Sequence, residues 1–196
     1  MKEIRVRVTT IEEMLGTASA DKNIHAEYIA SKAPDARTME EEVEAIGADE
    51  VFEKAMTVFP RVNGQPIVWD YQWKGFFKDA CGMLRKVPRS KCSAIKAYKK
   101  EIDGLIFVHP RAIPIQFEGD MQLCQRPLRG QTAQGERIAL ATSEAIPAGA
   151  TMEFSIQLLC NDHEDAVLEM LDYGVLRGFG QWRNSGKGRF EYEVIE

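Results

Sequence analysis

The stretch GFGQWRNSGKGRF, at residues 178–190, lies between a helical apolar pattern at 165–173 and an alternating pattern at 189–195. This order predicts a helix, a glycine-framed loop and a final strand. Glycine permits positive φ and lets backbone N–H groups approach a ligand closely. Within the frame, Trp182 offers a face for a stacked base and Arg183 a charge suited to phosphate. The stretch therefore favours a nucleic-acid backbone as ligand, and the alternative is a helix-to-strand turn with solvated charges.

Known mononucleotide and metal motifs are not matched. A P-loop requires Ser or Thr directly after Gly-Lys, whereas Gly186-Lys187 is followed by Gly188. A dinucleotide fingerprint follows a strand and opens a helix, which is the reverse of the order here. No His or Cys cluster has metal-ligand spacing, so we expect neither a metal nor another cofactor. The cysteines are scattered and are expected to be reduced thiols: Cys81, Cys92, Cys124 and Cys160.

The charges of the 196-residue chain are unevenly distributed. The net charge of −5 argues mildly against a protein coated in nucleic acid. Residues 35–53 are strongly acidic, whereas residues 74–100 are strongly basic with Asp79 as the one acid. Such asymmetry bears on binding surfaces, and two solvated helix faces are the alternative interpretation.

The N-terminal residues 1–6 lead straight into an alternating strand and lack the apolar stretch of a signal peptide. No apolar run in the sequence is long enough to span a membrane. We therefore expect a cytoplasmic protein without a membrane partner.

The order of the expected elements predicts an α+β fold. Helices are expected at 39–46, 48–57, 71–86, 92–98 and 165–173, with Asp70 as a cap. Strands are expected at 4–9, 105–109, 113–117, 121–125, 137–143, 151–159 and 189–195. This order is compatible with a ferredoxin-like, RRM-like β-α-β-β-α-β core with insertions, in which helices cover one face of a mainly antiparallel sheet. We expect one domain, 1–196, with an acidic helical insertion at 36–58 and a basic hairpin or loop near 125–137.

Three segments resemble the repeat-associated mysterious protein (RAMP) superfamily of CRISPR RNA-binding proteins, especially the backbone subunits along guide RNA. They are the loop at 178–190, the segment 71–78, similar to the family's Ser-Ser-Leu-Lys-Gly helix start, and the segment 144–154, similar to its Pro-x-Gly-x-x-Phe strand entry. The three occur in the family's order. The resemblance implies a ferredoxin-like RNA-recognition fold that holds guide or single-stranded RNA, with CRISPR effector subunits as possible partners and self-association as a further possibility.

The resemblance and the charges together give a set of candidate RNA-binding residues. They are Lys74, Lys78, Arg126, Arg129, Gly178, Gly180, Trp182, Arg183, Gly186, Lys187, Gly188 and Arg189. Some family members cut target RNA with an Asp of an early loop, but neither Asp21 nor Asp35 aligns securely with it. The expected role is therefore RNA binding without cleavage.

Two other functions stay open at this point. A metal-independent endoribonuclease of the guide-processing type would need a general base, and His25 is the candidate because it lies in the early loop. An ordinary polar loop histidine is the alternative there. The chain could also be a phage or mobile-element protein that contacts or inhibits a CRISPR complex through its acidic segment and glycine loop.

Overall fold

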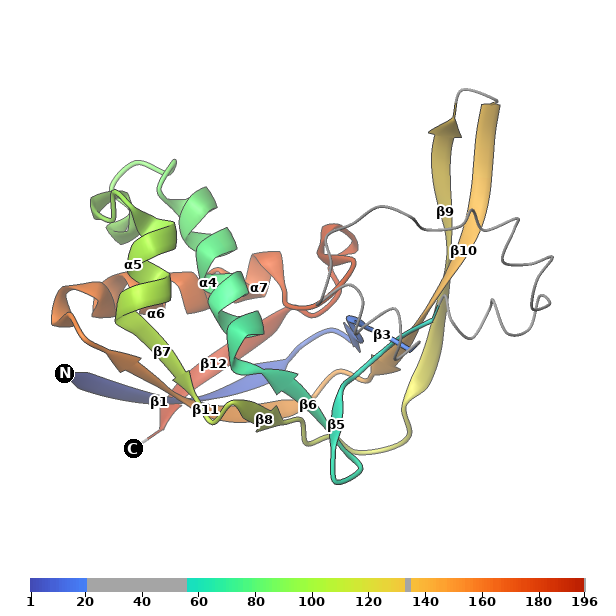
Figure 1. Cartoon of the computed structure of the whole chain (residues 1–196), viewed down its shortest axis with the longest axis horizontal. Helices are drawn as coiled ribbons and strands as arrows, with labels where there is room; N and C mark the ends of the chain where they lie inside the picture. The colour runs from blue at the N-terminus through green and yellow to red at the C-terminus, as the bar shows by residue number, and fades with distance from the viewer. Residues whose placement is uncertain (21–55, 133–134, 196) are drawn as a thin grey trace.

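The core of the protein is a four-stranded antiparallel sheet with the order β12-β1-β11-β7 (Figure 1). The computed structural model describes residues 1–20, 56–132 and 135–195, and within 128–139 it describes the backbone alone. The strands of this sheet are β1 (Lys2–Thr10), β7 (Ile106–His109), β11 (Thr151–Leu158) and β12 (Phe190–Ile195). In β1 and β11 buried and outward residues alternate, so each strand has one face in the core.

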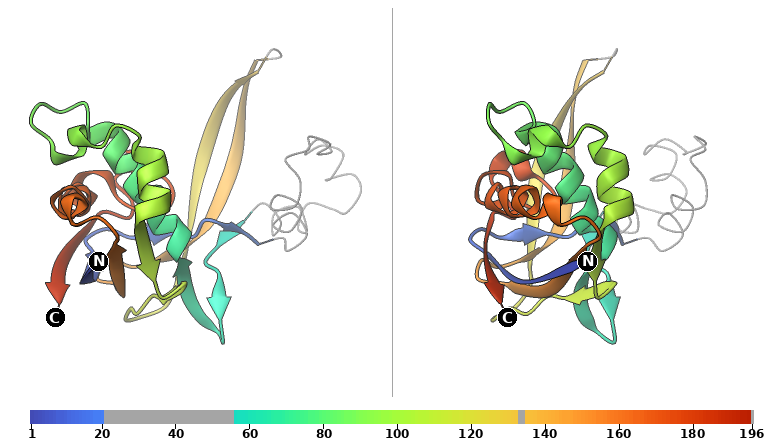
Figure 2. Two further views of the ribbon diagram at one scale, coloured as in Figure 1. Left: turned by 60° about the vertical axis from the view of Figure 1, so that its left-hand side comes forward. Right: turned by 90° about the vertical axis from the view of Figure 1, so that its left-hand side faces the viewer.

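The helices cover one face of this sheet (Figures 1 and 2). They are α4 (Asp70–Leu84), α5 (Tyr98–Leu105), α6 (Glu164–Asp172) and α7 (Gly174–Arg177), with short 3₁₀ turns η1 (Lys91–Ala94), η2 (Asn161–His163) and η3 (Arg183–Ser185). Helix α4 inserts Trp73 into the centre of the core, where its ring lies 4.5 Å from the ring centroids of Phe154 and Phe179. No helix among the described residues has the length and apolar character needed to cross a bilayer.

The expected α+β architecture and its mainly antiparallel sheet are confirmed, but two helix predictions are wrong in detail. Helix α4 is capped by Gln72, whose side chain accepts a 2.8 Å bond from the Trp69 N–H, and Asp70 lies in the first turn. The helix expected at 92–98 is absent: the Ser90 hydroxyl accepts a bond from the Cys92 N–H and starts η1, and α5 begins only at Tyr98. A local side-chain bond thus replaces the helix there.

Two smaller sheets flank the core. One contains β2 (Met14–Leu15), β3 (Ala18–Ser19), β4 (Thr57–Val58), β9 (Gln122–Thr132) and β10 (Gly135–Ile146); the other contains β5 (Arg61–Val62), β6 (Gln65–Trp69) and β8 (Ala112–Pro114). Strands β9 and β10 form a long ribbon that projects away from the core (Figure 1).

The two expected insertions can be placed in part. Strands β9 and β10 pair from Gly135↔Thr132 to Ala145↔Gln122, and the segment expected as a basic hairpin or loop near 125–137 lies within this antiparallel pair. Residues 36–55 of the acidic insertion expected at 36–58 lie outside the described residues. Its end is not helical, because Thr57 pairs in parallel with Ser143 of β10.

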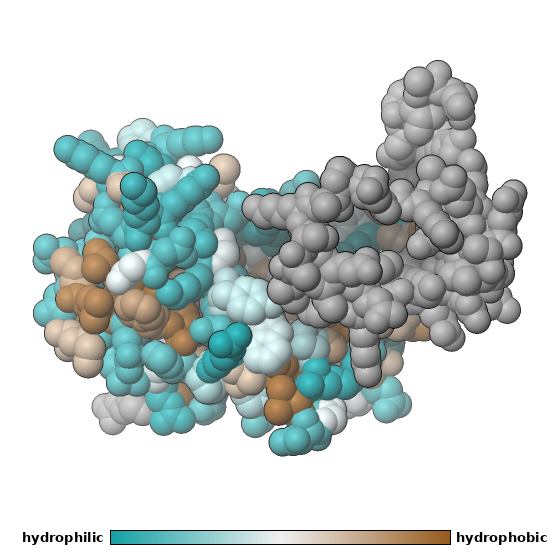
Figure 3. Space-filling view, in the orientation of Figure 1, coloured by the Kyte–Doolittle hydropathy of each residue, from teal (hydrophilic) through white to brown (hydrophobic). Residues whose placement is uncertain are grey.

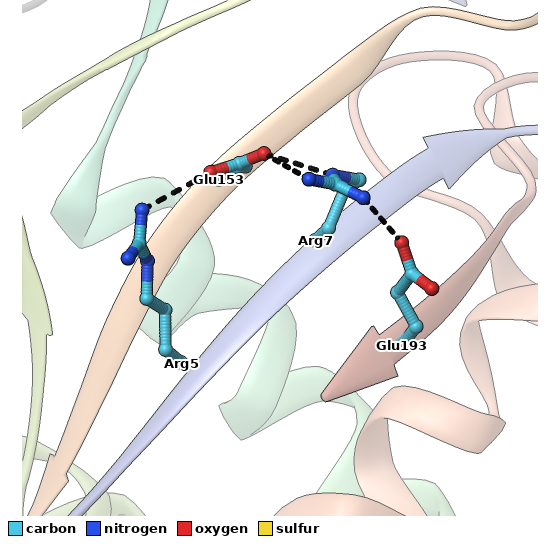
Figure 4. A network of polar contacts seen from close by, with 4 residues as sticks. All are labelled: Arg5, Arg7, Glu153 and Glu193. Carbon is cyan, nitrogen blue, oxygen red and sulfur yellow. Dashed lines mark hydrogen bonds and ion pairs between the residues drawn. The ribbon is translucent and has the colours of Figure 1, made fainter. Parts of the chain in front are cut away.

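Arg5 and Arg7 on the open face of the main sheet are paired with carboxylates of the same face (Figure 4). Arg7 donates to Glu153 at 2.8 Å and to Glu193 at 2.7 Å, and Arg5 reaches Glu153 at 3.3 Å. The hydrogen bonds to Glu153 and Glu193 raise the pKa of Arg7. The two central strands, β1 and β11, direct no aromatic residue outward, so they lack the base-stacking residues that an RRM carries on its sheet.

Candidate nucleic-acid interface

The glycine loop at 178–190 is closed by two glycines that no other residue could replace without strain. Gly178 and Gly188 have φ of +73° and +68°. A Cβ at Gly188 would lie 1.9 Å from the Phe179 carbonyl oxygen, and one at Gly178 would lie 2.4 Å from that of Lys187. The Phe179 N–H donates a 2.8 Å bond to the Gly188 carbonyl. The two Gly-x-Gly pairs therefore pack on each other and present the segment between them.

The loop is fixed to the chain segment that follows β1. The Gly188 N–H donates to the Glu13 carbonyl and the Ile11 N–H to the Arg189 carbonyl, both at 2.8 Å. The Glu13 carboxylate also pairs with the Lys187 ammonium and raises its pKa. Lys187, a candidate RNA ligand, thus has a partner within the protein.

Asp79 of α4 holds the other side of the loop. Its carboxylate accepts bonds of 2.8 Å from both Arg177 and Arg183, and Arg177 also reaches Asn184 at 3.2 Å. Partial burial alone would raise the pKa of Asp79, but the two guanidinium groups hold it below its ordinary value. Asp79 therefore ties the charged centre of the loop to α4.

The lowered pKa of Asp79 gives a pH dependence with a defined sign. Its stabilising effect is fully present above the unfolded-state pKa, about 4, and is lost as the pH falls through the lower folded-state pKa. We expect wild type to unfold at a higher temperature than Asp79→Asn at pH 7, and the gap to close below about pH 4. Thermal unfolding across pH measures this, with Asp120→Asn at an exposed site as control. A gap that stays constant down to about pH 2 would contradict it.

An aromatic and a cation from different elements meet above the loop. Trp182, with φ of +53°, is 40% exposed, and the Arg126 guanidinium of β9 lies 5.0 Å from its ring centroid. Arg126 donates to Gln181 at 3.0 Å and to Ser143 of β10 at 3.2 Å. The base of the β9–β10 ribbon and the glycine loop therefore form one surface.

The charge of Arg126 is not balanced by any carboxylate among the described residues. The residue is only 7% exposed, its hydrogen-bond partners are neutral, and its Nε has no partner within the described part of the chain. The side chain of Arg189 lies beneath Gly186, and its Nε likewise has no hydrogen-bond partner within the described part of the chain. Burying an arginine without a carboxylate is costly, so Arg126 is a candidate for an anionic ligand, and the half-buried Arg189 is a second candidate.

A cavity of about 320 Å³ lies between the loop and the start of α4. It is lined by Thr17, Gln72, Gly75, Phe76, Phe179, Gly180 and Arg183. Gln72 donates a 2.8 Å bond to the Thr17 hydroxyl, so the polar wall is ordered. The volume is at the lower end for ligand sites. It could admit a small polar group such as part of a nucleotide.

Other candidate residues are not brought to this site. Lys74 donates to the Asp103 carbonyl at 3.1 Å and lies 4.3 Å above the Phe107 ring, and Lys78 pairs with the Asp103 carboxylate at 2.8 Å. Both lysines therefore face α5. Arg129 lies in β9, and its side chain is outside the described part, as is His25 entirely.

The three segments that resemble the RAMP pattern lie together in space. Gln72 and Gly75 share the cavity with the loop, and Phe154 packs on Trp73 beneath it. Sequence reasoning missed Glu13 and Asp79 as anchors of the loop. Asp79 could have been found from the sequence, because it is the one acidic residue in the basic stretch 74–100.

Comparisons with known proteins identify a fold but no family. No family model and no curated protein matches the chain. A chain in the cryo-EM structure of the Type III-B Cmr-beta bound to cognate target RNA has a TM-score of 0.58 at 14% identity. The match covers 100% of this chain, which spans 61% of the length of that one. A chain of a Type IV-B CRISPR complex has a TM-score of 0.49 at 10% identity, covering 99% and 90% of the two chains. At such identities the likeness concerns the fold alone.

Proposed function

We propose that this protein binds single-stranded or guide RNA, without cleaving it, as a RAMP-type subunit of a CRISPR complex. The sheet order β12-β1-β11-β7, with α4 and α5 between β1 and β7 and α6 between β11 and β12, supports a ferredoxin-like core. The fold likeness to a chain of an RNA-bound Cmr-beta structure supports RNA as ligand and subunits of such a complex as partners.

The observation that carries the proposal is the pairing of Trp182 with Arg126. A half-exposed tryptophan can stack a base, and the guanidinium beneath it supplies positive charge that no described carboxylate balances. Stacking accepts any base, so little sequence preference is expected. The cavity beside Arg183 would receive an adjacent part of the strand.

The ion pairs of the loop set how RNA would be held. Arg183 and Lys187 are already paired with Asp79 and Glu13, so a phosphate there would compete with a carboxylate. Arg126 and Arg189 have no such competitor among the described residues. The phosphate contacts at Arg126 and Arg189 would therefore add most to affinity.

Replacing Trp182 by alanine tests the stacking contact. We expect the affinity for a labelled single-stranded RNA to fall about tenfold, since stacking on an aromatic residue contributes about 1–3 kcal/mol per base. Fluorescence anisotropy at several salt concentrations measures it. Tyr71→Ala is the matched control, because Tyr71 is 53% exposed but stacks on Trp69 outside the cavity lining.

The outcomes separate the alternatives. Equal losses in the two variants would place the bound RNA away from the loop. Wild-type protein that binds no RNA at any salt concentration would overturn the proposal and direct attention to protein partners.

A further inference from the structure

A second, strongly basic hollow lies between the C-terminal half of α4 and α5. It encloses about 560 Å³ and is lined by Lys78, Asp79, Gly82, Met83, Arg85, Lys86, Tyr98 and Lys99. Hydrophilic side chains gather over these two helices in Figure 3. We call this feature the α4–α5 groove.

The cations of the α4–α5 groove are of two kinds. Arg85 and Lys78 are held in place: Arg85 donates to the Lys96 carbonyl at 3.3 Å and lies 5.2 Å from the Tyr98 ring centroid, and Lys78 pairs with the Asp103 carboxylate at 2.8 Å. Lys86 and Lys99 are exposed and form no ion pair within the described part of the chain. The groove thus combines an ordered wall with two lysines that have no described acidic partner.

The one carboxylate in the lining does not neutralise these lysines. Asp79 directs its oxygens to Arg177 and Arg183, each at 2.8 Å. The same aspartate links the groove to the glycine-loop site, because Arg183 lines the cavity of that site. The two basic surfaces are therefore neighbours across Asp79, and a continuous polyanion could occupy both.

The shape of the groove is set by the close approach of α4 to α5. A Cβ at Gly82 would lie 3.1 Å from the Tyr98 hydroxyl oxygen, so a side chain there would push against Tyr98. The glycine leaves room for a hollow that is lined by the Tyr98 ring and by cationic side chains. A phosphodiester backbone, which carries regularly spaced negative charges, matches such a cationic lining.

We propose that the α4–α5 groove is a second contact for the same RNA strand and receives the phosphates that lie beyond the glycine loop. This inference rests on the proposed function, because it requires an RNA strand that is already bound at the glycine loop. Its contiguity with the loop favours RNA over an acidic polypeptide.

Short and long RNAs distinguish the two sites. An RNA of about 6 nucleotides should occupy one site, whereas about 16 nucleotides should span both. Reversing two charges, in Lys86→Glu with Lys99→Glu, should lower the affinity for the long RNA about tenfold and leave the short RNA unchanged. The slope of log K against log salt for the long RNA should become shallower by about 1.4, because each of the two phosphates that the variant no longer neutralises accounts for about 0.7.

The matched control is Lys2→Glu with Arg111→Glu, which makes the same charge change outside the groove. It should leave the binding of both RNAs unchanged. Tight binding of the long RNA by the groove variant would overturn this inference while the proposed function stands. Failure of wild type to bind either RNA would overturn both. If the groove variant loses binding only to polyglutamate, the groove takes an acidic polypeptide and the RNA assignment is wrong.

Discussion

Replacing Gly188 by alanine should lower the free energy of unfolding by about 3 kcal/mol. An L-residue in the left-handed region costs about 1–2 kcal/mol, and forcing a side chain into filled space costs about 1–3 kcal/mol more. Both apply at Gly188, where φ is +68° and the new Cβ would lie 1.9 Å from the Phe179 carbonyl oxygen. That atom belongs to the backbone, so relief requires the loop itself to open.

Gly64 provides the matched control for this substitution. Its φ is +82°, but a Cβ there would meet nothing within 4 Å. Gly64→Ala should therefore lower the free energy of unfolding only by the cost of the left-handed backbone conformation, about 1 kcal/mol. Urea unfolding followed by tryptophan fluorescence gives both values. Equal losses at the two glycines would show that the loop is not closed by the Gly178 and Gly188 contact.

Replacing Arg126 by methionine should weaken RNA binding about 30-fold without loss of stability. The side chain is 7% exposed and pairs only with neutral groups among the described residues. Replacing a buried charge by an apolar residue of similar size is often neutral or stabilising. The substitution removes the cation–π contact between Arg126 and Trp182. It also removes an interaction with phosphate of about 2 kcal/mol.

Arg61→Met is the control for removal of one positive charge. Arg61 pairs with Glu144 at 2.6 Å and lies outside the lining of the loop cavity. Its loss should leave RNA affinity unchanged when binding is measured at fixed salt. If Arg126→Met unfolds the protein without changing the affinity of the folded fraction, Arg126 is a structural residue and its role in RNA binding is wrong.

The parts of the fold that depend on local pattern were predictable. Apolar spacing indicated α4 and α6, and alternation indicated β1 and β12, because both signals are periodicities of one segment. The helix expected at 92–98 failed because one side chain, Ser90, starts a 3₁₀ turn. The length of β9 and β10 depends on how the two neighbouring segments pair with each other, as far as Ala145↔Gln122, and the pattern of either segment alone does not give it.

The candidate site, too, was predictable only where it depends on a local pattern of the sequence. Glycine spacing indicated the loop, and its cations and Trp182 were visible in the sequence. Which acid meets which cation was not predictable: Asp79 and Glu13 are 104 and 174 residues from their partners. The direction of a side chain around a helix decides that Lys74 and Lys78 face α5 rather than the loop.

The central claim is that RNA lies on the glycine loop over Trp182, and fluorine NMR tests it most directly. The chain has three tryptophans, so 5-fluorotryptophan labelling gives three signals that single Trp→Phe variants assign. We expect RNA to displace the Trp182 signal more than those of Trp69 and the fully buried Trp73. Saturating RNA that leaves the Trp182 signal in place would contradict the account.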